Sequence, residues 1–377
     1  MNNWLIDNIL TFAFGFAAVA CIIPQILFVA HKLHLFDSTG ERKIHSGAVP
    51  RLGGVSFAPS IIFAVLLVLA LTRTESLPEM IMLLKKDVNG MFLLFCGMIC
   101  MFMVGIADDL VEVRYRTKFI FQIIVGILIA RAGILISNLD GFLGITLLPD
   151  WIAWALTILI IVYIMNSFNL IDGIDGLSGT LTLIPVLFYG YVCYSSGHYI
   201  YSMITFAAGG CLLPFLYYNI FGSVDKHKKI FMGDTGALTN GLVLAFMGIE
   251  VTNIENYGGC LQDVKPIIMA LSPLVVPMFD QLRVFFHRIV RRRNPFLPDK
   301  CHIHHKLLYM GLSTRATLVV ILIIALLFIA LNLFLSAIPL GVSWIVLIDF
   351  LVWTIGNMIL TSAIRRRERR LDTKLFS

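Results

Sequence analysis

The chain has 377 residues, of which 58% are hydrophobic and only 14% charged, and its mean hydropathy is +0.88. Soluble globular domains carry about 25% charged residues, so this composition excludes an ordinary soluble protein and predicts a polytopic membrane protein. The seven cysteines lie mostly within apolar runs and form no CxxC pair, which argues against a disulfide framework.

Apolar runs long enough to cross about 30 Å of hydrocarbon recur along the whole chain. The first run lacks the basic start and the cleavage site of a signal peptide, so we count it as a span. Because no low-complexity linker separates the runs, we expect residues 1–377 to form a single all-α membrane domain. About eleven transmembrane helices are predicted, at residues 9–30, 52–72, 89–107, 119–137, 151–166, 177–194, 199–219, 236–252, 266–287, 316–337 and 341–362.

Lys and Arg are distributed unevenly between the two sides of this predicted bundle. Most of the 29 fall in alternate connections, including 31–51, 108–118 and 283–315, and in the tail after residue 362. Cytoplasmic loops carry the excess of basic residues, so we expect the N-terminus outside and the C-terminus inside. The basic run Arg365–Arg370 then fits an anchor to anionic lipid headgroups.

The dense polar clusters all lie in the connections predicted to be cytoplasmic. In the first of these, Arg42, Lys43 and His45 precede a Gly53–Gly54 helix entry that could hold phosphate oxygens, or could be a basic loop with a turn. Asp108 and Asp109 end the third span. Adjacent carboxylates at a membrane edge require an offsetting charge, which the basic residues just after them could supply.

The stretch 166–179 is polar and rich in glycine within a largely apolar chain. Asn169, Asp172 and Asp175 offer the hard oxygen ligands that Mg²⁺ prefers. No Lys or Arg lies in this stretch, so an external cation or a basic neighbour must offset the two carboxylates. Asp234, in a glycine-flanked turn before the next apolar run, is either a helix N-cap or a further ligand.

The last long connection carries the histidines His302, His304 and His305 after a run of arginines. Such a cluster could bind a phosphate or diphosphate, and zinc with Cys301 is the rival interpretation. Carboxylates, amides and cationic groups together are what phosphoryl-transfer sites need, and the chain lacks a P-loop signature. The membrane setting implies that one substrate is a lipid.

Four motifs in order resemble the polyprenyl-phosphate N-acetylhexosamine-1-phosphate transferases, at Ala107–Leu110, Asn166–Leu177, Phe231–Gly236 and Pro295–His305. The chain is most similar to the bacterial undecaprenyl-phosphate N-acetylglucosamine-1-phosphate transferases. The resemblance covers residues 37–305, and the last two helices and the basic tail follow it at 306–377.

The resemblance implies a phosphoglycosyl transferase of the cytoplasmic, or inner, membrane of a bacterium. Undecaprenyl phosphate would attack the β-phosphate of UDP-GlcNAc, forming undecaprenyl-diphosphate-GlcNAc and UMP, with Mg²⁺ or Mn²⁺ on the diphosphate. This step would initiate an O-antigen, common-antigen or teichoic-acid type of glycan. The expected partners are the lipid and the UDP-sugar, not nucleic acid, and a homodimer is compatible with the pattern.

Carried over by motif position, Asn169 and Asp234 would be metal ligands, and Asp108 would serve the lipid phosphate as the favoured base. Asp175 would lie near the uracil. The six residues assigned to catalysis are Asp108, Asp109, Asp234, His302, His304 and His305. The nine assigned to substrate binding are Arg42, Lys43, His45, Asp172, Asp175, Gly176, Arg291, Arg292 and Arg293.

Several alternatives stay open at this point. The sister family that uses UDP-MurNAc-pentapeptide carries an all-histidine triplet, and the His-Ile-His-His order here favours UDP-GlcNAc or another UDP-HexNAc. Direct attack by the lipid phosphate is favoured over an aspartyl-phosphate intermediate, because a phosphate monoester is largely dianionic at neutral pH. A multi-pass transporter of an anionic solute should carry its polar site near the midplane. The mid-span charged residues Arg131 and Asp349 lie toward the outer half and are expected to pair.

Overall fold

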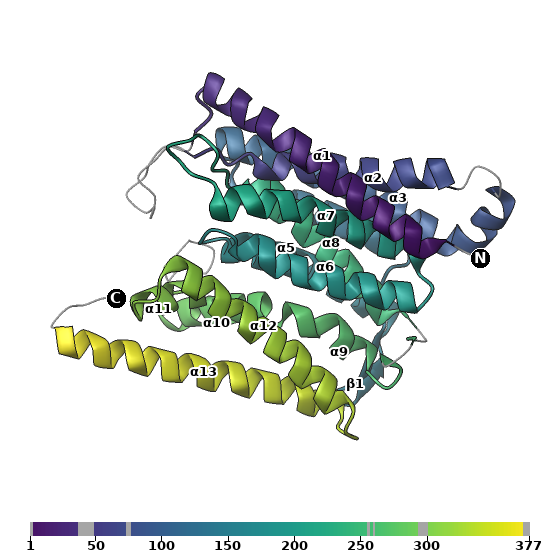
Figure 1. Ribbon diagram of the computed structural model, residues 1–377. Coiled ribbons are helices and arrows are strands. Elements are labelled where there is room, and N and C mark those ends of the chain that lie inside the picture. The colour runs from purple at the N-terminus through teal and green to yellow at the C-terminus, as the bar shows by residue number, and fades with distance from the viewer. Residues whose placement is uncertain are drawn as a thin grey trace.

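The computed structural model describes residues 3–36, 49–72, 77–254, 257–258, 261–292 and 301–371, apart from the side chains of 77–86 and 370–371. Figure 1 shows long helices lying side by side, with α1 at one edge of the bundle and α13 at the other. The elements in chain order are α1 (Trp4–Lys32), η1 (Gly53–Ser56), α2 (Phe57–Thr72), α3 (Leu77–Val111), α4 (Tyr115–Arg131), β1 (Asn138–Phe142), β2 (Ile145–Leu147), α5 (Asp150–Ile171), α6 (Leu177–Ser195), α7 (Tyr199–Phe221), α8 (Gly233–Thr252), α9 (Pro266–Leu271), η3 (Ser272–Leu274), α10 (Val275–Val290), α11 (Ile303–Tyr309), α12 (Thr314–Ser336) and α13 (Val342–Leu371).

Ten helical segments of the described residues are long and apolar enough to cross a membrane, and each overlaps a predicted span. This identifies a multi-pass, mostly helical membrane protein. The remaining predicted span, 119–137, corresponds to α4, which has 17 residues and lies at the short limit for a crossing. The expected pairing of Arg131 with Asp349 is wrong: the buried Asp349 accepts a hydrogen bond from Asn332, at 2.9 Å.

Two local features differ from the predicted helices: a β-hairpin and a break in one span. A small antiparallel hairpin joins α4 to α5, and its turn residues Leu143 and Gly144 both have positive φ, as the tight turn of a two-residue hairpin requires. The predicted span 266–287 is a broken helix, in which the 3₁₀ turn η3 separates α9 from α10. Pro273, within that turn, lacks the N–H that an unbroken α-helix would need.

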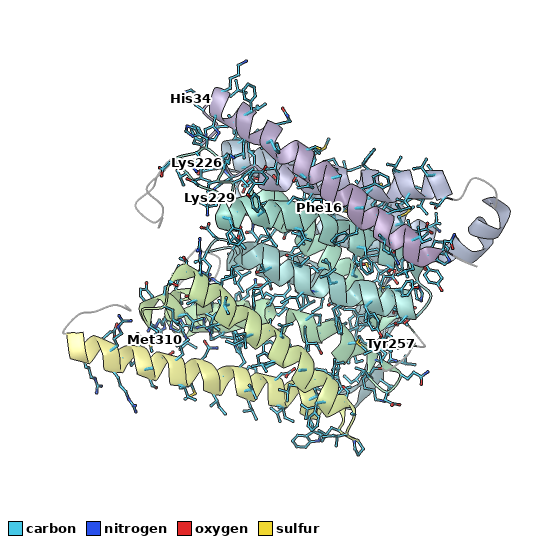
Figure 2. The ribbon with its side chains drawn as sticks, viewed as in Figure 1. Phe16, His34, Lys226, Lys229, Tyr257 and Met310 are labelled. Atoms are coloured by element: carbon cyan, nitrogen blue, oxygen red, sulfur yellow. The ribbon has the colours of Figure 1, made fainter. Side chains whose placement is uncertain are left out.

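Helix α8 forms the centre of the bundle. It is buried along its whole length from Thr235 to Val251 and packs against α3, α5 and α6. Burial on every face is what a helix in the interior of a bundle shows. The buried residues of α8 nevertheless include the polar Thr239, Asn240 and Glu250. The polar motifs gather at the end of the bundle where α3 ends and α8 begins, which we call the motif end. Figure 2 shows Lys226 and Lys229 at this end and Tyr257 at the other.

The Gly53–Gly54 entry is structural. The N–H of Gly53 donates to the carbonyl of Phe231 at 2.9 Å, and that of Gly54 to Met232 at 2.8 Å. These donors are therefore already engaged and do not face a phosphate. A Cβ placed on Gly54 would lie 2.0 Å from the backbone nitrogen of Gly236, so only glycine lets η1 approach the first turn of α8 this closely.

The first prediction concerns this contact. Gly54→Ala should lower the unfolding temperature in detergent, because overpacking a backbone contact costs about 1–3 kcal/mol or more. The matched control is Gly356→Ala in α13, where no described atom lies within 4 Å of the added carbon. Alanine raises helix stability there by about 0.5–1 kcal/mol. Equal unfolding temperatures for the two variants would contradict the assigned contact.

Candidate functional site

Asp109 joins the end of α3 to the start of α8. Its Oδ1 accepts the backbone N–H of Asp234 at 2.7 Å, and its Oδ2 accepts the N–H and the hydroxyl of Thr235 at 3.0 and 2.6 Å. The first N–H groups of a helix have no partner within the helix and carry partial positive charge. Asp109 is thus an N-cap supplied by another helix, which holds Asp234 in place.

Asp108 and Asp234 converge on one cation. Lys118, from the first turn of α4, places its Nζ 2.8 Å from Oδ2 of Asp108 and 2.7 Å from Oδ2 of Asp234. Oδ1 of Asp108 accepts the N–H of Val113 at 2.8 Å, and Asn169, in the last turn of α5, hydrogen-bonds to Asp234. Three helices and the start of α4 therefore bring two carboxylates, an amide and an ammonium group together.

The turn after α5 adds two more carboxylates. Asp175 pairs with Lys229, whose Nζ lies 2.6 Å from Oδ2; Lys229 belongs to the connection between α7 and α8 (Figure 2). Asp172 is exposed at the surface of the structure. Loss of hydration in the crowded cluster, followed by repulsion from Asp234 and Asp175, raises the pKa of Asp172 to about 7. Added positive charge at this position would favour its ionised form.

Gly176 serves the fold of this turn. It is the buried N-cap residue of α6 with φ of +79°, and its N–H donates to the side chain of Asn219 at 2.5 Å. The left-handed conformation explains why glycine stands here. The structure therefore gives Gly176 a turn-forming position beside the carboxylates.

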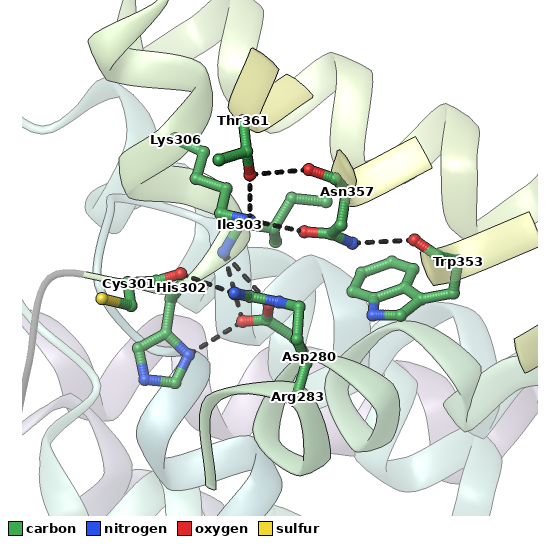
Figure 3. A network of polar contacts seen from close by, with 9 residues as sticks. All are labelled: Asp280, Arg283, Cys301, His302, Ile303, Lys306, Trp353, Asn357 and Thr361. Carbon is green, nitrogen blue, oxygen red and sulfur yellow. Dashed lines mark hydrogen bonds and ion pairs between the residues drawn. The ribbon is translucent and has the colours of Figure 1, made fainter. Parts of the chain in front are cut away.

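The histidines are held by Asp280 of α10. Oδ2 of this fully buried carboxylate lies 2.8 Å from Nδ1 of His302, and Oδ1 lies 2.8 Å from Nη2 of Arg283 (Figure 3). Asp280 also accepts the N–H of Ile303, at 3.1 Å, and so caps α11 as Asp109 caps α8. A carboxylate on Nδ1 leaves Nε2 of His302 as the ring atom available for a ligand.

His304 connects the histidines to the carboxylate turn. Its ring stacks on His302, with centroids 5.8 Å apart, and packs directly on Gly173, where a Cβ would lie 2.1 Å from Nε2. Burial, and then the neighbouring His305 and His302, hold the pKa of His304 well below its usual value. Both of its ring nitrogens are buried without a hydrogen-bond partner among the described residues, so His304 presents a neutral imidazole with unused polar atoms.

The remaining predicted residues are divided. Arg42, Lys43, His45 and Arg293 lie outside the described residues. Arg291 lines a separate cavity between α10, α11 and α13. Arg292, two residues after the end of α10, has φ of +53° and an exposed side chain. The structure therefore gives neither Arg291 nor Arg292 a contact with the carboxylate cluster among the described residues.

Three charged residues outside the predicted set have defined positions in the site: Lys118, Lys229 and Asp280. Lys118 was one of the cations expected to offset Asp108, and Lys229 is the basic neighbour that Asp175 required. Asp280 comes directly after an apolar run, as Asp108 does. This placement of an acid is the sequence signal that indicates it.

The donor set fits a hard divalent cation that is completed by a substrate. No three His, Cys, Asp or Glu side chains of the described residues converge closely enough to hold an ion by themselves. Asp234, Asp108 and Asn169 supply oxygens only, and Mg²⁺ commonly takes one or two carboxylates together with substrate phosphates. The arrangement can therefore bind a phosphorylated substrate and a divalent cation jointly.

Asp280 should be far more important to stability than Asp349, which is also fully buried. Asp280→Asn removes the acceptor of a buried ion-paired network and should cost roughly 3–5 kcal/mol. Asp349→Asn should change the free energy of unfolding little, because among the described residues the Asp349 carboxylate is hydrogen-bonded only to Asn332. Unfolding temperatures in detergent measure both. An Asp280→Asn variant as stable as Asp349→Asn would refute the role given to Asp280.

Asp172 should make stability depend on pH. Between about pH 4, near the pKa of an unfolded Asp, and about pH 7, near its folded pKa, the folded chain keeps a proton that the unfolded chain has released. The contribution of Asp172 to the free energy of unfolding therefore falls as pH rises through this window. In the presence of a chelator, Asp172→Asn should gain stability relative to the native protein across the same window. If the difference in stability between Asp172→Asn and the native protein does not change with pH, Asp172 does not have the raised pKa assigned to it.

Comparison with known proteins agrees with this geometry. Residues 91–252, from within α3 to the end of α8, match the family described as glycosyl transferase family 4. A "Probable undecaprenyl-phosphate N-acetylglucosaminyl 1-phosphate transferase" of Bacillus subtilis (strain 168) is 28% identical over 335 residues, covering 87% of this chain and 85% of the relative.

Two further relatives carry the name "Undecaprenyl-phosphate alpha-N-acetylglucosaminyl 1-phosphate transferase". The protein from Yersinia pestis is 27% identical and covers 92% of this chain and 90% of its own length. The protein from Escherichia coli (strain K12) is 26% identical, with 96% and 97% covered. Together with the motifs and their convergence at one end of the bundle, the match of residues 91–252 to glycosyl transferase family 4 and the names of the relatives indicate a phosphoglycosyl transferase.

Proposed function

We propose that this protein transfers N-acetylglucosamine-1-phosphate from UDP-GlcNAc to undecaprenyl phosphate, releasing UMP and forming undecaprenyl-diphosphate-GlcNAc. The names of its relatives support the reaction. The observation that carries the proposal is the convergence of Asp108 and Asp234 on Lys118, with Asn169 bonded to Asp234. Oxygen ligands beside a cationic group are what a diphosphate with a divalent cation requires.

The proposed metal is Mg²⁺, with Mn²⁺ as a substitute, held by Asp234 and Asn169 with Asp108 near it. When bound, such an ion neutralises diphosphate charge as the leaving group departs. Lys118 lies between the two carboxylates, which supports binding of positive charge at this position. Asp109 would contribute by fixing Asp234, since both of its oxygens are engaged with the start of α8.

In the proposed reaction an oxygen of the lipid phosphate attacks the β-phosphorus of UDP-GlcNAc. The bond from that phosphorus to the bridging oxygen breaks, and UMP leaves with the bonding electrons. The second pKa of a phosphate monoester is near 6, so the attacking group needs little help from a base. Both oxygens of Asp108 are hydrogen-bonded, which supports direct attack over an aspartyl-phosphate intermediate.

The histidines would bind the diphosphate and sugar. Nε2 of His302 is oriented by Asp280, and His304 has unused ring nitrogens beside the Asp172–Asp175 turn. A neutral imidazole that donates a hydrogen bond can stabilise phosphate oxygens as charge moves in the transition state. Asp175, paired with Lys229, is the group proposed to lie near the uracil.

The motif end is proposed to face the cytoplasm of a bacterial inner membrane, since most Lys and Arg gather in its connections. The product would begin a cell-envelope glycan. A transporter is disfavoured, because the carboxylates lie at helix ends and not near a midplane: Asp108 in the last turn of α3 and Asp234 in the first of α8.

The choice of sugar rests on the His-Ile-His-His order and on the names of the relatives. Another UDP-HexNAc is the second candidate. A screen of UDP-HexNAc donors and UDP-MurNAc-pentapeptide with the purified protein and undecaprenyl phosphate should give the fastest UMP release with UDP-GlcNAc. Faster release with the peptide-bearing sugar would overturn this assignment while leaving the reaction class intact.

Asp234 should be essential to this activity. Asp234→Asn should lower UMP release at least about 100-fold, the loss typical when a preorganised charged group is removed from a reacting phosphate. Asp225→Asn is the matched control, because Asp225 is an exposed acid in the connection just before α8. Native-like release by Asp234→Asn, in a variant that elutes as folded protein, would refute the proposed site.

A further inference from the structure

A second cluster of basic side chains surrounds a cavity of about 210 Å³ between α10, α11 and α13. We call it the basic cavity. Its cationic lining is Arg283 of α10, Arg291 just after that helix, Lys306 of α11 and Arg365 of α13, with His287 and one acid, Glu368, beside them. The volume is well above the roughly 30 Å³ that one water takes in the liquid, so the space can hold a small anion with water.

Arg283 forms the wall between this cavity and the histidines. Its Nη2 donates to Asp280 at 2.8 Å and to the carbonyl of Cys301 at 2.5 Å, as Figure 3 shows. Its Nε is buried and has no hydrogen-bond partner among the described residues. A buried guanidinium N–H without an acceptor is costly, and an anion in the cavity would supply one.

Lys306 is the least hydrated of these cations. It is 4% exposed, and its Nζ donates to Asn357 at 3.1 Å and to Thr361 at 3.0 Å. Burial, followed by repulsion from Arg283, lowers the pKa of Lys306 to about 8. Two neutral oxygens leave one of its three N–H donors for another acceptor. Lys306 therefore has donor capacity for an anion in the cavity.

We propose that the basic cavity is a second phosphate-binding site, separate from the carboxylate cluster. Two arginines and a lysine from different helices can surround a tetrahedral oxyanion, and arginine is suited to phosphate by its planar pair of donors. The phosphate would hold Arg283 against Asp280, and through Asp280 it would support the orientation of His302.

Two kinds of molecule could supply a phosphate group to the basic cavity. The membrane-spanning part of α13 carries many exposed apolar side chains, so the headgroup of an anionic phospholipid could enter with its chains along that helix. Inorganic phosphate could enter from water. The chemistry recognised is the same, and the experiment separates the sources.

The test uses the full-length protein and two probes. In neutral detergent, inorganic phosphate is titrated against chloride at constant ionic strength. In lipid discs, phosphatidylcholine alone is compared with phosphatidylcholine containing phosphatidylglycerol. Unfolding temperature reports binding, because a ligand of the folded state raises it. The variants are Arg365→Gln and Lys306→Met, and the matched control is Arg366→Gln, the adjacent exposed arginine that lies outside the cavity.

The native protein and Arg366→Gln should be stabilised by at least one probe. For the same rise in unfolding temperature, Arg365→Gln and Lys306→Met should need about a tenfold higher concentration of that probe, the loss expected for one charged hydrogen bond. A response to phosphatidylglycerol alone identifies a lipid headgroup, and a response to inorganic phosphate shows that the free anion suffices. If neither probe stabilises the native protein, or if both cavity variants respond as Arg366→Gln does, the proposal is wrong. Arg365 is exposed, so its variant should fold and decide the question even if Lys306→Met does not.

Discussion

The carboxylate of Asp109, bonded to the first N–H groups of α8, is the interaction on which the site depends. It satisfies donors that the helix itself cannot, and it joins two helices that are distant in sequence. Asp280 does the same for α11, where it accepts the N–H of Ile303. In each case an acid from one helix fixes the start of another, so the position of a helix end is set by a buried charge and not by loop conformation.

The functional side chains are immediate neighbours of these two caps. Asp108 precedes Asp109, and Asp234 itself donates to it, so the pair that converges on Lys118 is positioned within one residue of the anchor. His302 is both the N-cap residue of α11 and a partner of Asp280. Rigid elements place reacting groups more accurately than mobile loops do, which fits a reaction that needs aligned phosphates.

The sequence predicted the spans and the polar clusters, because apolar length and the cost of charge near a membrane are local properties. The resemblance favoured Asp108 as the base, but the residues alone could not show what approaches each of the two adjacent acids: Lys118 contacts Asp108, and the start of α8 contacts Asp109. The sequence also left open what offsets Asp175, since Lys229 lies more than fifty residues further along the chain. The hairpin after α4 and the break at η3 were missed because their short turns were read as parts of apolar runs or connections.

The central claim is that the carboxylate pair binds a divalent cation together with the diphosphate of the donor. Electron paramagnetic resonance of Mn²⁺, which loses its free-ion signal when bound, tests this directly. We expect the native protein to bind Mn²⁺ much more tightly when UDP-GlcNAc is present, and Asp234→Asn to lose that enhancement. Equal Mn²⁺ binding by the native protein and the variant in the presence of UDP-GlcNAc would contradict the account.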